Sequence, residues 1–219
     1  MSNDIKEELG IEEEKPADWF EPLYAGADRD GTGVPWANMV THPSFAQWLT
    51  KYQLDGVGST ALVIGCGMGD DAVELESFGF DVTAFDVSAS AIQYCKERFP
   101  DSKVNFLQAD LLKEQPHWDR QFDFVLEIFT VQALPPKYEE QLIENISKFV
   151  ALNGQLLVIA EVKDEQRSYQ NGPPWLLSPQ HIDMFRDQGL DVVGQYIESS
   201  SLDDELSNTY ITTFKNNAS

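Results

Sequence analysis

The chain has few basic residues, and this shortage argues against several kinds of partner. Its 219 residues include 15 Lys and Arg against 37 Asp and Glu, a formal net charge of −22. Binding nucleic-acid phosphates or an anionic membrane surface requires clustered Lys and Arg. The composition therefore predicts neither a nucleic-acid partner nor a membrane partner. The negative charge favours solubility, and the alternative interpretation is a preference for neutral or cationic substrates.

Cysteines, long apolar runs and secretion signals are also scarce or missing. Only Cys66 and Cys95 occur, so no disulfide framework is expected. The first residues have neither the basic start nor the apolar stretch of a signal peptide. No apolar run approaches the length of a membrane span. These absences predict a cytoplasmic protein, and the sequence carries no signal for an oligomeric state.

The most informative segment is an apolar run that ends in three glycines. Residues 60–71 read Thr-Ala-Leu-Val-Ile-Gly-Cys-Gly-Met-Gly-Asp-Asp, and a second apolar run at 81–87 reaches an acid at Asp86. A buried strand, glycine turn, helix, second strand and acidic tip in this order predict an α/β nucleotide-binding unit. The glycines allow a tight turn close to a ligand. The carboxylate can accept two hydrogen bonds from a ribose diol.

Two ligand classes fit this unit, a dinucleotide and S-adenosylmethionine (SAM). Dinucleotide enzymes usually show G-x-G-x-x-G, with a pyrophosphate at a helix N-terminus. Here the spacing is G-x-G-x-G, and the negative charges of Asp70 and Asp71 would repel a pyrophosphate. SAM has a positive sulfonium and no phosphate. The loop Val-Ile-Gly-Cys-Gly-Met-Gly, with the later Phe-Asp-Val-Ser, resembles the SAM loop of class I methyltransferases.

The resemblance implies SAM as the cofactor and a role for each matching residue. The glycine loop would hold the methionine part, and Asp86 the ribose, with Val87 near the adenine. Asp110, at the end of the third strand, would face the adenine amino group. Glu127 lies in an apolar strand, where a carboxylate needs a partner, and would meet the SAM amino group or line the substrate pocket. The expected cofactor-binding residues are Gly65, Cys66, Gly67, Gly69, Asp86, Val87, Asp110, Leu111, Glu127 and Trp36.

Composition divides the chain into three parts. Residues 1–16 are acidic and expected to be mobile, residues 17–58 form an aromatic N-terminal lid, and residues 59–219 form the core. The region from Tyr24 to Trp36 and the loop Asn171–Trp175 resemble parts of thiopurine and thiol methyltransferases, which act on small molecules. This resemblance suggests Tyr24 and Trp175 for a substrate pocket, although Trp36 and Trp175 could equally belong to the core.

Alternating strands and helices predict the fold. Strands are expected near 60–65, 81–87, 103–109, 122–129 and 155–162, with helices near 44–52, 70–78, 89–99, 138–150 and 179–188. Two final strands near 191–198 and 208–215 should pair antiparallel, because only an acidic loop joins them. The predicted class is α/β, a doubly wound, mostly parallel seven-stranded sheet with a C-terminal antiparallel hairpin, as in class I methyltransferases.

No catalytic base or metal site is visible in the sequence. His42, His117 and His181 are isolated, and neither a Ser-His-Asp arrangement nor metal-ligand spacing occurs. Methyl transfer tolerates this, because SAM already carries an activated leaving group and the protein chiefly aligns the nucleophile and excludes water. We expect a SAM-dependent methyltransferase acting on sulfur or oxygen of a small molecule. A non-catalytic SAM-binding protein and a nicotinamide-dependent oxidoreductase are the alternatives.

Overall fold

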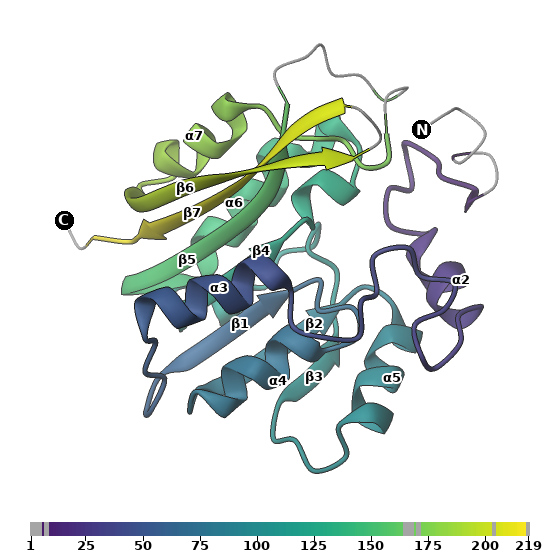
Figure 1. Ribbon diagram of the computed structural model, residues 1–219, viewed down its shortest axis with the longest axis horizontal. Helices are drawn as coiled ribbons and strands as arrows, with labels where there is room; N and C mark the ends of the chain where they lie inside the picture. The colour runs from purple at the N-terminus through teal and green to yellow at the C-terminus, as the bar shows by residue number, and fades with distance from the viewer. Residues whose placement is uncertain (1–5, 7–8, 164–168, 170–171, 203–204, 218–219) are drawn as a thin grey trace. The chain divides into compact units, whose positions relative to one another are not determined.

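The sheet has seven strands, in the order β3-β2-β1-β4-β5-β7-β6. The computed structural model describes residues 6, 9–163, 169, 172–202 and 205–217, and Asn171 lies outside them. The strands are parallel except at the C-terminal end of the chain, where β7 runs antiparallel to both of its neighbours. The predicted fold class is therefore confirmed (Figure 1). The chain divides into two units, residues 17–110 and residues 1–16 with 111–219.

The unit of residues 17–110 begins with two helices and continues as a parallel three-stranded α/β unit. Its strands pair in parallel, from Thr60 opposite Asp81 to Asp86 opposite Gln108. Helix α4 contacts β1 and β2, whereas α5 contacts β2, β3 and α2. The elements are α2 (Phe20–Ala25), α3 (Pro43–Tyr52), β1 (Thr60–Ile64), α4 (Asp70–Ser77), β2 (Asp81–Asp86), α5 (Ala89–Arg98) and β3 (Asn105–Gln108).

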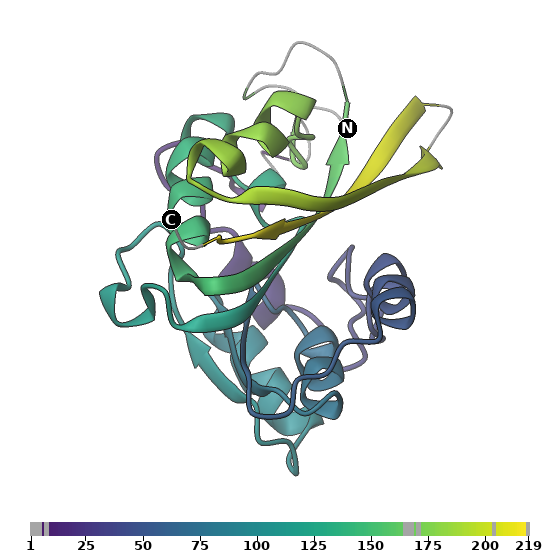
Figure 2. The same cartoon turned by 90° about the vertical axis from the view of Figure 1, so that its left-hand side faces the viewer.

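The second unit contains the hairpin and the helices that cover it. Strand β5 pairs in parallel with β4 and antiparallel with β7, and β6 completes the hairpin. Helix α6 contacts both β5 and α7 (Figure 2), and Phe185 of α7 packs on Phe214 of β7. The elements are η1 (Pro116–Trp118), β4 (Phe122–Ile128), η2 (Val131–Ala133), η3 (Pro136–Tyr138), α6 (Glu139–Phe149), β5 (Val150–Val162), α7 (Pro179–Asp187), β6 (Asp191–Leu202) and β7 (Glu205–Lys215).

Helix ends follow the local sequence signals. The Ser88 side chain caps α5 by accepting a hydrogen bond from the Ala91 N–H at 3.1 Å, a common role of serine at a helix start. Ser178 caps α7 in a capping box with His181, and Pro179 occupies the first turn. Gly79 and Gly189 follow α4 and α7 with positive φ, the usual conformation after a helix.

Several strand boundaries differ from the prediction. Strand β5 begins at Val150 and not at residue 155, because pairing with β4 already starts there and continues across a bulge. The bulge lies between Val150 and Gln155 of β5, in a stretch that contains Asn153-Gly154, and Asn153 has a φ of 65°. An Asn-Gly pair in a sequence is typical of a turn. The hairpin strands are also longer than expected, because backbone pairing continues to Leu202 opposite Glu205.

The described residues near the N-terminus make contacts within their own unit. The Lys6 amino group donates to the carbonyl of Tyr169 at 2.7 Å, and the Tyr169 hydroxyl donates to the carbonyl of Ile11 at 2.7 Å. The Tyr138 hydroxyl donates to the carbonyl of Glu13. The mobility of residues 1–16 and the division into tail, lid and core remain predictions. In the part of the chain that the structure describes, no helix is long and apolar enough to cross a membrane.

Candidate functional site

The glycine loop between β1 and α4 has a backbone conformation that lets a neighbouring group approach it closely. Gly65, Gly67 and Gly69 all have positive φ, at 58°, 50° and 89°, a region that L-residues with side chains rarely occupy. A Cβ at Gly67 would lie 3.0 Å from the Tyr24 hydroxyl, and one at Gly69 would lie 2.9 Å from the Cys95 sulfur. The loop therefore requires glycine for both backbone conformation and space.

Asp86 lies at the end of β2 and holds this loop. Its Oδ2 accepts a hydrogen bond from the Gly67 N–H at 3.0 Å, and its Oδ1 accepts one from the Ser88 N–H at 2.9 Å. The side chain is 6% exposed, and burial raises its pKa to about 6. Each carboxylate oxygen has a second lone pair, so the group retains acceptor capacity for a ribose diol. The residues predicted for the methionine and ribose parts of SAM are thus brought together.

The two cysteines lie together at the same loop. The Cys95 thiol donates to the carbonyl of Gly67 at 3.1 Å, and the Cys66 N–H donates to the carbonyl of Phe85 at 2.9 Å. The pKa of the Cys66 thiol is raised well above its usual value. The hydrogen bond with Cys95 is the larger cause, and burial is the next. Cys66 is therefore held as an uncharged part of the loop.

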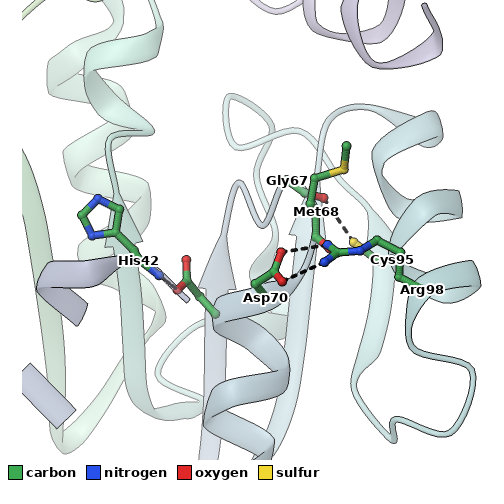
Figure 3. Close-up of polar contacts among 7 residues, drawn as sticks. His42, Gly67, Met68, Asp70, Cys95 and Arg98 are labelled. Atoms are coloured by element: carbon green, nitrogen blue, oxygen red, sulfur yellow. Dashed lines mark hydrogen bonds and ion pairs between the residues drawn. The ribbon is translucent and has the colours of Figure 1, made fainter. Parts of the chain in front are cut away.

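The two acids after the loop are hydrogen-bonded to other residues, and Figure 3 shows Asp70 with Arg98. The guanidinium of Arg98 binds Asp70 with two contacts of 2.8 Å and donates to the carbonyl of Met68 at 2.6 Å. The His42 N–H donates to Asp71 at 2.7 Å, and burial raises the Asp71 pKa to about 6. The expectation that both acids would leave unbalanced negative charge at the loop is wrong for Asp70, because Arg98 neutralises it. The sequence argument against a pyrophosphate is weakened accordingly.

Aromatic side chains from the predicted lid contact the loop. The Trp36 indole N–H donates to the Tyr24 hydroxyl at 3.0 Å, and the Trp36 ring meets Trp19 edge to face. Trp36 is 44% exposed, whereas Tyr24 is buried. Burial raises the pKa of Tyr24 well above its usual value, and the nearby Asp86 charge adds to this effect. Tyr24 packs with Met68 of the glycine loop and Ala91 of α5.

Glu21 connects the same segment to the start of α5, and sequence reasoning missed it. Its carboxylate accepts hydrogen bonds from the hydroxyls of Ser88 and Ser90, both at 2.7 Å, and from the Ser90 N–H at 3.1 Å. Burial would raise the pKa of Glu21, but these hydrogen bonds outweigh it and lower the pKa. The available signal was the pair of serines beside Asp86, since hydroxyls and N–H groups at a helix start attract a carboxylate.

The residues predicted for the adenine follow the ends of β2 and β3. The carbonyl of Val87 accepts a hydrogen bond from the Gln108 amide at 2.9 Å, and Asp110 lies two residues beyond Gln108, partly buried. Leu111, the first residue of the second unit in this region, is buried and its carbonyl accepts a hydrogen bond from Asn145 at 2.8 Å. Their contacts with adenine remain predictions.

Glu127 and Trp175 belong to the second unit and are both buried. The Glu127 Oε1 accepts hydrogen bonds from the N–H groups of Thr130 and Val131, at 2.7 and 3.0 Å. Burial raises the pKa of Glu127 to about 7, although these two bonds oppose the shift. Trp175 stacks on Tyr169 and is 2% exposed. Its place in a substrate pocket remains a prediction.

Comparisons with known sequences point to methyl transfer. Residues 61–154 match a family described as "Methyltransferase domain". The chain is similar to probable thiol methyltransferase 2 of Arabidopsis thaliana, at 26% identity over 77% of this chain and 70% of that protein. It is also similar to a ubiquinone biosynthesis O-methyltransferase of Rickettsia akari (strain Hartford), at 31% identity over 51% of this chain. The chain spans 43% of that second relative.

Solved structures share the fold at low sequence identity. A protein solved for "Conversion of a Disulfide Bond into a Thioacetal Group during Echinomycin Biosynthesis" has a TM-score of 0.70 at 20% identity, covering 92% of this chain and 93% of that one. Magnesium protoporphyrin IX methyltransferase from Synechocystis PCC 6803, solved with bound SAM, has a TM-score of 0.60 at 16% identity, covering 78% and 76%. The glycine loop, the methyltransferase match over residues 61–154 and these relatives together support a class I SAM-dependent methyltransferase.

Proposed function

We propose that this methyltransferase acts on a small molecule and transfers the methyl group to sulfur or oxygen. The main support is the thiol methyltransferase of Arabidopsis thaliana, because its similarity covers 172 residues and so extends well beyond the matched methyltransferase domain. The O-methyltransferase of Rickettsia akari supports oxygen as the other acceptor atom. The net charge of −22 disfavours a nucleic-acid acceptor.

In this proposal the glycine loop and the strand ends bind and orient the cofactor. SAM, when bound, supplies a methyl group on a positively charged sulfur. The backbone at Gly65, Cys66, Gly67 and Gly69 lies along its methionine part, and Asp86 accepts hydrogen bonds from the ribose. The expected adenine contacts are Val87, Asp110 and Leu111.

The aromatic segment has a separate role in this proposal. Tyr24 and Trp36 close over the loop and exclude water from the reacting groups, and the indole face of Trp36 attracts the sulfonium. The acceptor then needs to be aligned in line with the methyl carbon, with its nucleophilic atom in near-attack geometry. Trp175 is a further candidate for the wall of the acceptor pocket.

The test combines binding with turnover. In calorimetry, SAM and S-adenosylhomocysteine should bind, and NAD should not. Transfer of a labelled methyl group from SAM should then be measured with thiols, phenols, amines and a short RNA. We expect the labelled methyl group to be transferred to thiols or phenols. Transfer only to amines or RNA would contradict the proposed acceptor. Tight binding of S-adenosylhomocysteine without transfer to any acceptor would favour a SAM-binding protein that transfers no methyl group.

A further inference from the structure

One oxygen of Glu127 is buried without a hydrogen-bond partner. The side chain has no exposed surface, and its Oε2 receives no hydrogen bond, whereas Oε1 receives two. A buried polar atom left unpaired costs about 1–3 kcal/mol, and more when the group is charged. Such an atom in a folded protein therefore calls for a specific explanation.

Stabilising the turn after β4 does not explain the choice of glutamate. That turn needs one acceptor for the N–H groups of Thr130 and Val131, and Oε1 alone provides it. A glutamine would provide the same acceptor with a neutral side chain, at a smaller desolvation cost. The second, ionisable oxygen is left without a structural task.

The position of Glu127 is one where α/β proteins bind ligands. Glu127 lies one residue before the end of β4, opposite Val158 of the parallel strand β5. In open α/β sheets, ligands bind beyond the carboxyl ends of parallel strands. The chain beyond this end of the two strands includes Gln132, whose side chain accepts a hydrogen bond from the Glu161 N–H at 2.8 Å. The backbone carbonyl of Gln132 accepts a hydrogen bond from the backbone N–H of Trp175 at 2.7 Å.

The ionisable groups on the neighbouring elements are few. Strand β5 carries Glu161, which is half-buried and whose pKa is raised by burial. Helix α6, which contacts η2, carries Glu139, and this carboxylate lies 3.0 Å from the imidazole of His181 on α7. Element η2 has no ionisable residue. Burial is therefore the main influence on Glu127, and a pKa of about 7 suits a base that works near neutral pH.

We infer that the free Oε2 of Glu127 accepts the proton of the acceptor's S–H or O–H group during methyl transfer. This inference rests on the proposed function. Of the two roles expected for Glu127, it takes the place in the substrate pocket and not the contact with the SAM amino group. The S–H or O–H bond breaks and its proton moves to Oε2. The electron pair left on the acceptor atom forms the new bond to the methyl carbon. The bond between that carbon and the SAM sulfur breaks, and its electron pair remains on S-adenosylhomocysteine.

The test compares an acceptor that needs a base with one that does not. At pH 7 an aliphatic thiol such as 2-mercaptoethanol is mostly protonated, whereas 4-nitrothiophenol is mostly ionised. Glu127→Gln keeps the Oε1 acceptor and the side-chain shape, so the fold should be retained. We expect its turnover with 2-mercaptoethanol to fall by about 100-fold or more, the usual contribution of a general base, and its turnover with 4-nitrothiophenol to change by less than about threefold.

Two controls separate this role from cofactor binding and from a general loss of charge. The affinity of Glu127→Gln for S-adenosylhomocysteine should match that of the wild type. Glu161→Gln removes the half-buried carboxyl of the neighbouring strand β5, and it should preserve the ratio of the two turnover rates. With the protonated thiol, the wild-type rate should rise with pH through about 7, and Glu127→Gln should lose this rise.

The outcomes decide the inference and the proposed function separately. Equal losses with both thiols, or weakened binding of S-adenosylhomocysteine, would place Glu127 in cofactor binding or folding and overturn the inference alone. No loss with either thiol would also overturn it alone. If the wild-type protein binds S-adenosylhomocysteine but methylates neither these thiols nor phenols, the proposed acceptor class is wrong and the proposed role of Glu127 is wrong with it.

Discussion

The carboxylate of Asp86 has two hydrogen-bonding roles, one in holding the glycine loop and one, as proposed, in binding the ribose. Its two oxygens already hold the N–H groups of Gly67 and Ser88, and the ribose of SAM would use their remaining lone pairs. Both roles are best filled by the ionised form, yet burial raises the pKa to about 6. A bound ligand that donates hydrogen bonds to the carboxylate should therefore lower this pKa and favour the charged form.

Replacing Asp86 by alanine should weaken both cofactor binding and the loop. We expect the binding free energy of SAM to become less favourable by about 1.5–3 kcal/mol, the range for a hydrogen bond to a charged group. Thermal unfolding should also shift to lower temperature, because the N–H groups of Gly67 and Ser88 lose their acceptor. Asp81→Ala, at the exposed opposite end of β2, is the matched control. Calorimetry that finds full SAM affinity in Asp86→Ala would remove Asp86 from the ribose site.

Single residues that act through a partner far along the chain were the least predictable. Arg98 reaches Asp70 across 28 positions, and Glu21 reaches Ser88 across 67. No sequence pattern predicts contacts at these separations, because both contacts depend on how the helices pack in the folded chain. Asp86 and the glycines could be predicted since a strand, a tight turn and a second strand bring them together locally.

At the scale of elements, hydrogen bonds and apolar packing hold helix α2 and the residues that follow it on α5. Glu21 binds the serines at the start of α5, and the Tyr94 hydroxyl of α5 donates to the carbonyl of Ala27 at 3.1 Å. Apolar packing around Tyr24 adds to these bonds. Arg29 and Glu97 form an additional ion pair at 2.9 Å, with the arginine 77% exposed.

Residues 17–40 should exchange amide hydrogens faster without cofactor than with it. S-adenosylhomocysteine should protect them, because a bound ligand stabilises the closed arrangement. Glu21→Ala should speed exchange in the free protein, since three hydrogen bonds are lost. Glu97→Gln, which breaks the exposed pair with Arg29, should have little effect because such pairs contribute about 0–1 kcal/mol. Equally strong protection with and without ligand would identify the segment as fixed scaffold.

Most helices and strands could be predicted because their signals are local. Ser88, Ser178 and Pro179 mark helix starts, and apolar runs mark the buried strands. The start of β5 could not be found this way. Asn153-Gly154 is typical of a turn, but these residues lie inside a bulged strand, where the Asn153 N–H and the Gly154 carbonyl are hydrogen-bonded to the backbone of Asn216. Strand pairing with a distant segment thus overrode the local turn signal.

At the scale of the whole molecule, three buried acids make stability depend on pH. Burial raises the pKa values of Asp71 and Asp86 to about 6 and that of Glu127 to about 7. Between their usual and raised values, the folded protein holds protons that the unfolded chain has released. The free energy of unfolding therefore falls as pH rises through this window, and the penalty is complete above about pH 7.

Thermal unfolding of the free protein should occur at a higher temperature near pH 5.5 than near pH 8. The high net negative charge acts in the same direction, because protonation reduces repulsion. In Glu127→Gln, the melting temperature should change less with pH near pH 7. Glu140→Gln, at an exposed position of α6, should show the same dependence of melting temperature on pH as the wild type. A melting temperature that is constant or increases from pH 5.5 to 8 would contradict the assigned burial of these acids.

The exposure of Trp36 gives the protein an intrinsic optical probe. Of the five tryptophans, Trp36 is 44% exposed, whereas Trp19, Trp48, Trp118 and Trp175 are buried. A small neutral quencher such as acrylamide therefore reaches one indole far more readily than the others, and the high negative charge does not repel it. Since that indole is hydrogen-bonded to Tyr24 beside the glycine loop, unmodified protein can report by its own fluorescence when this part of the chain closes.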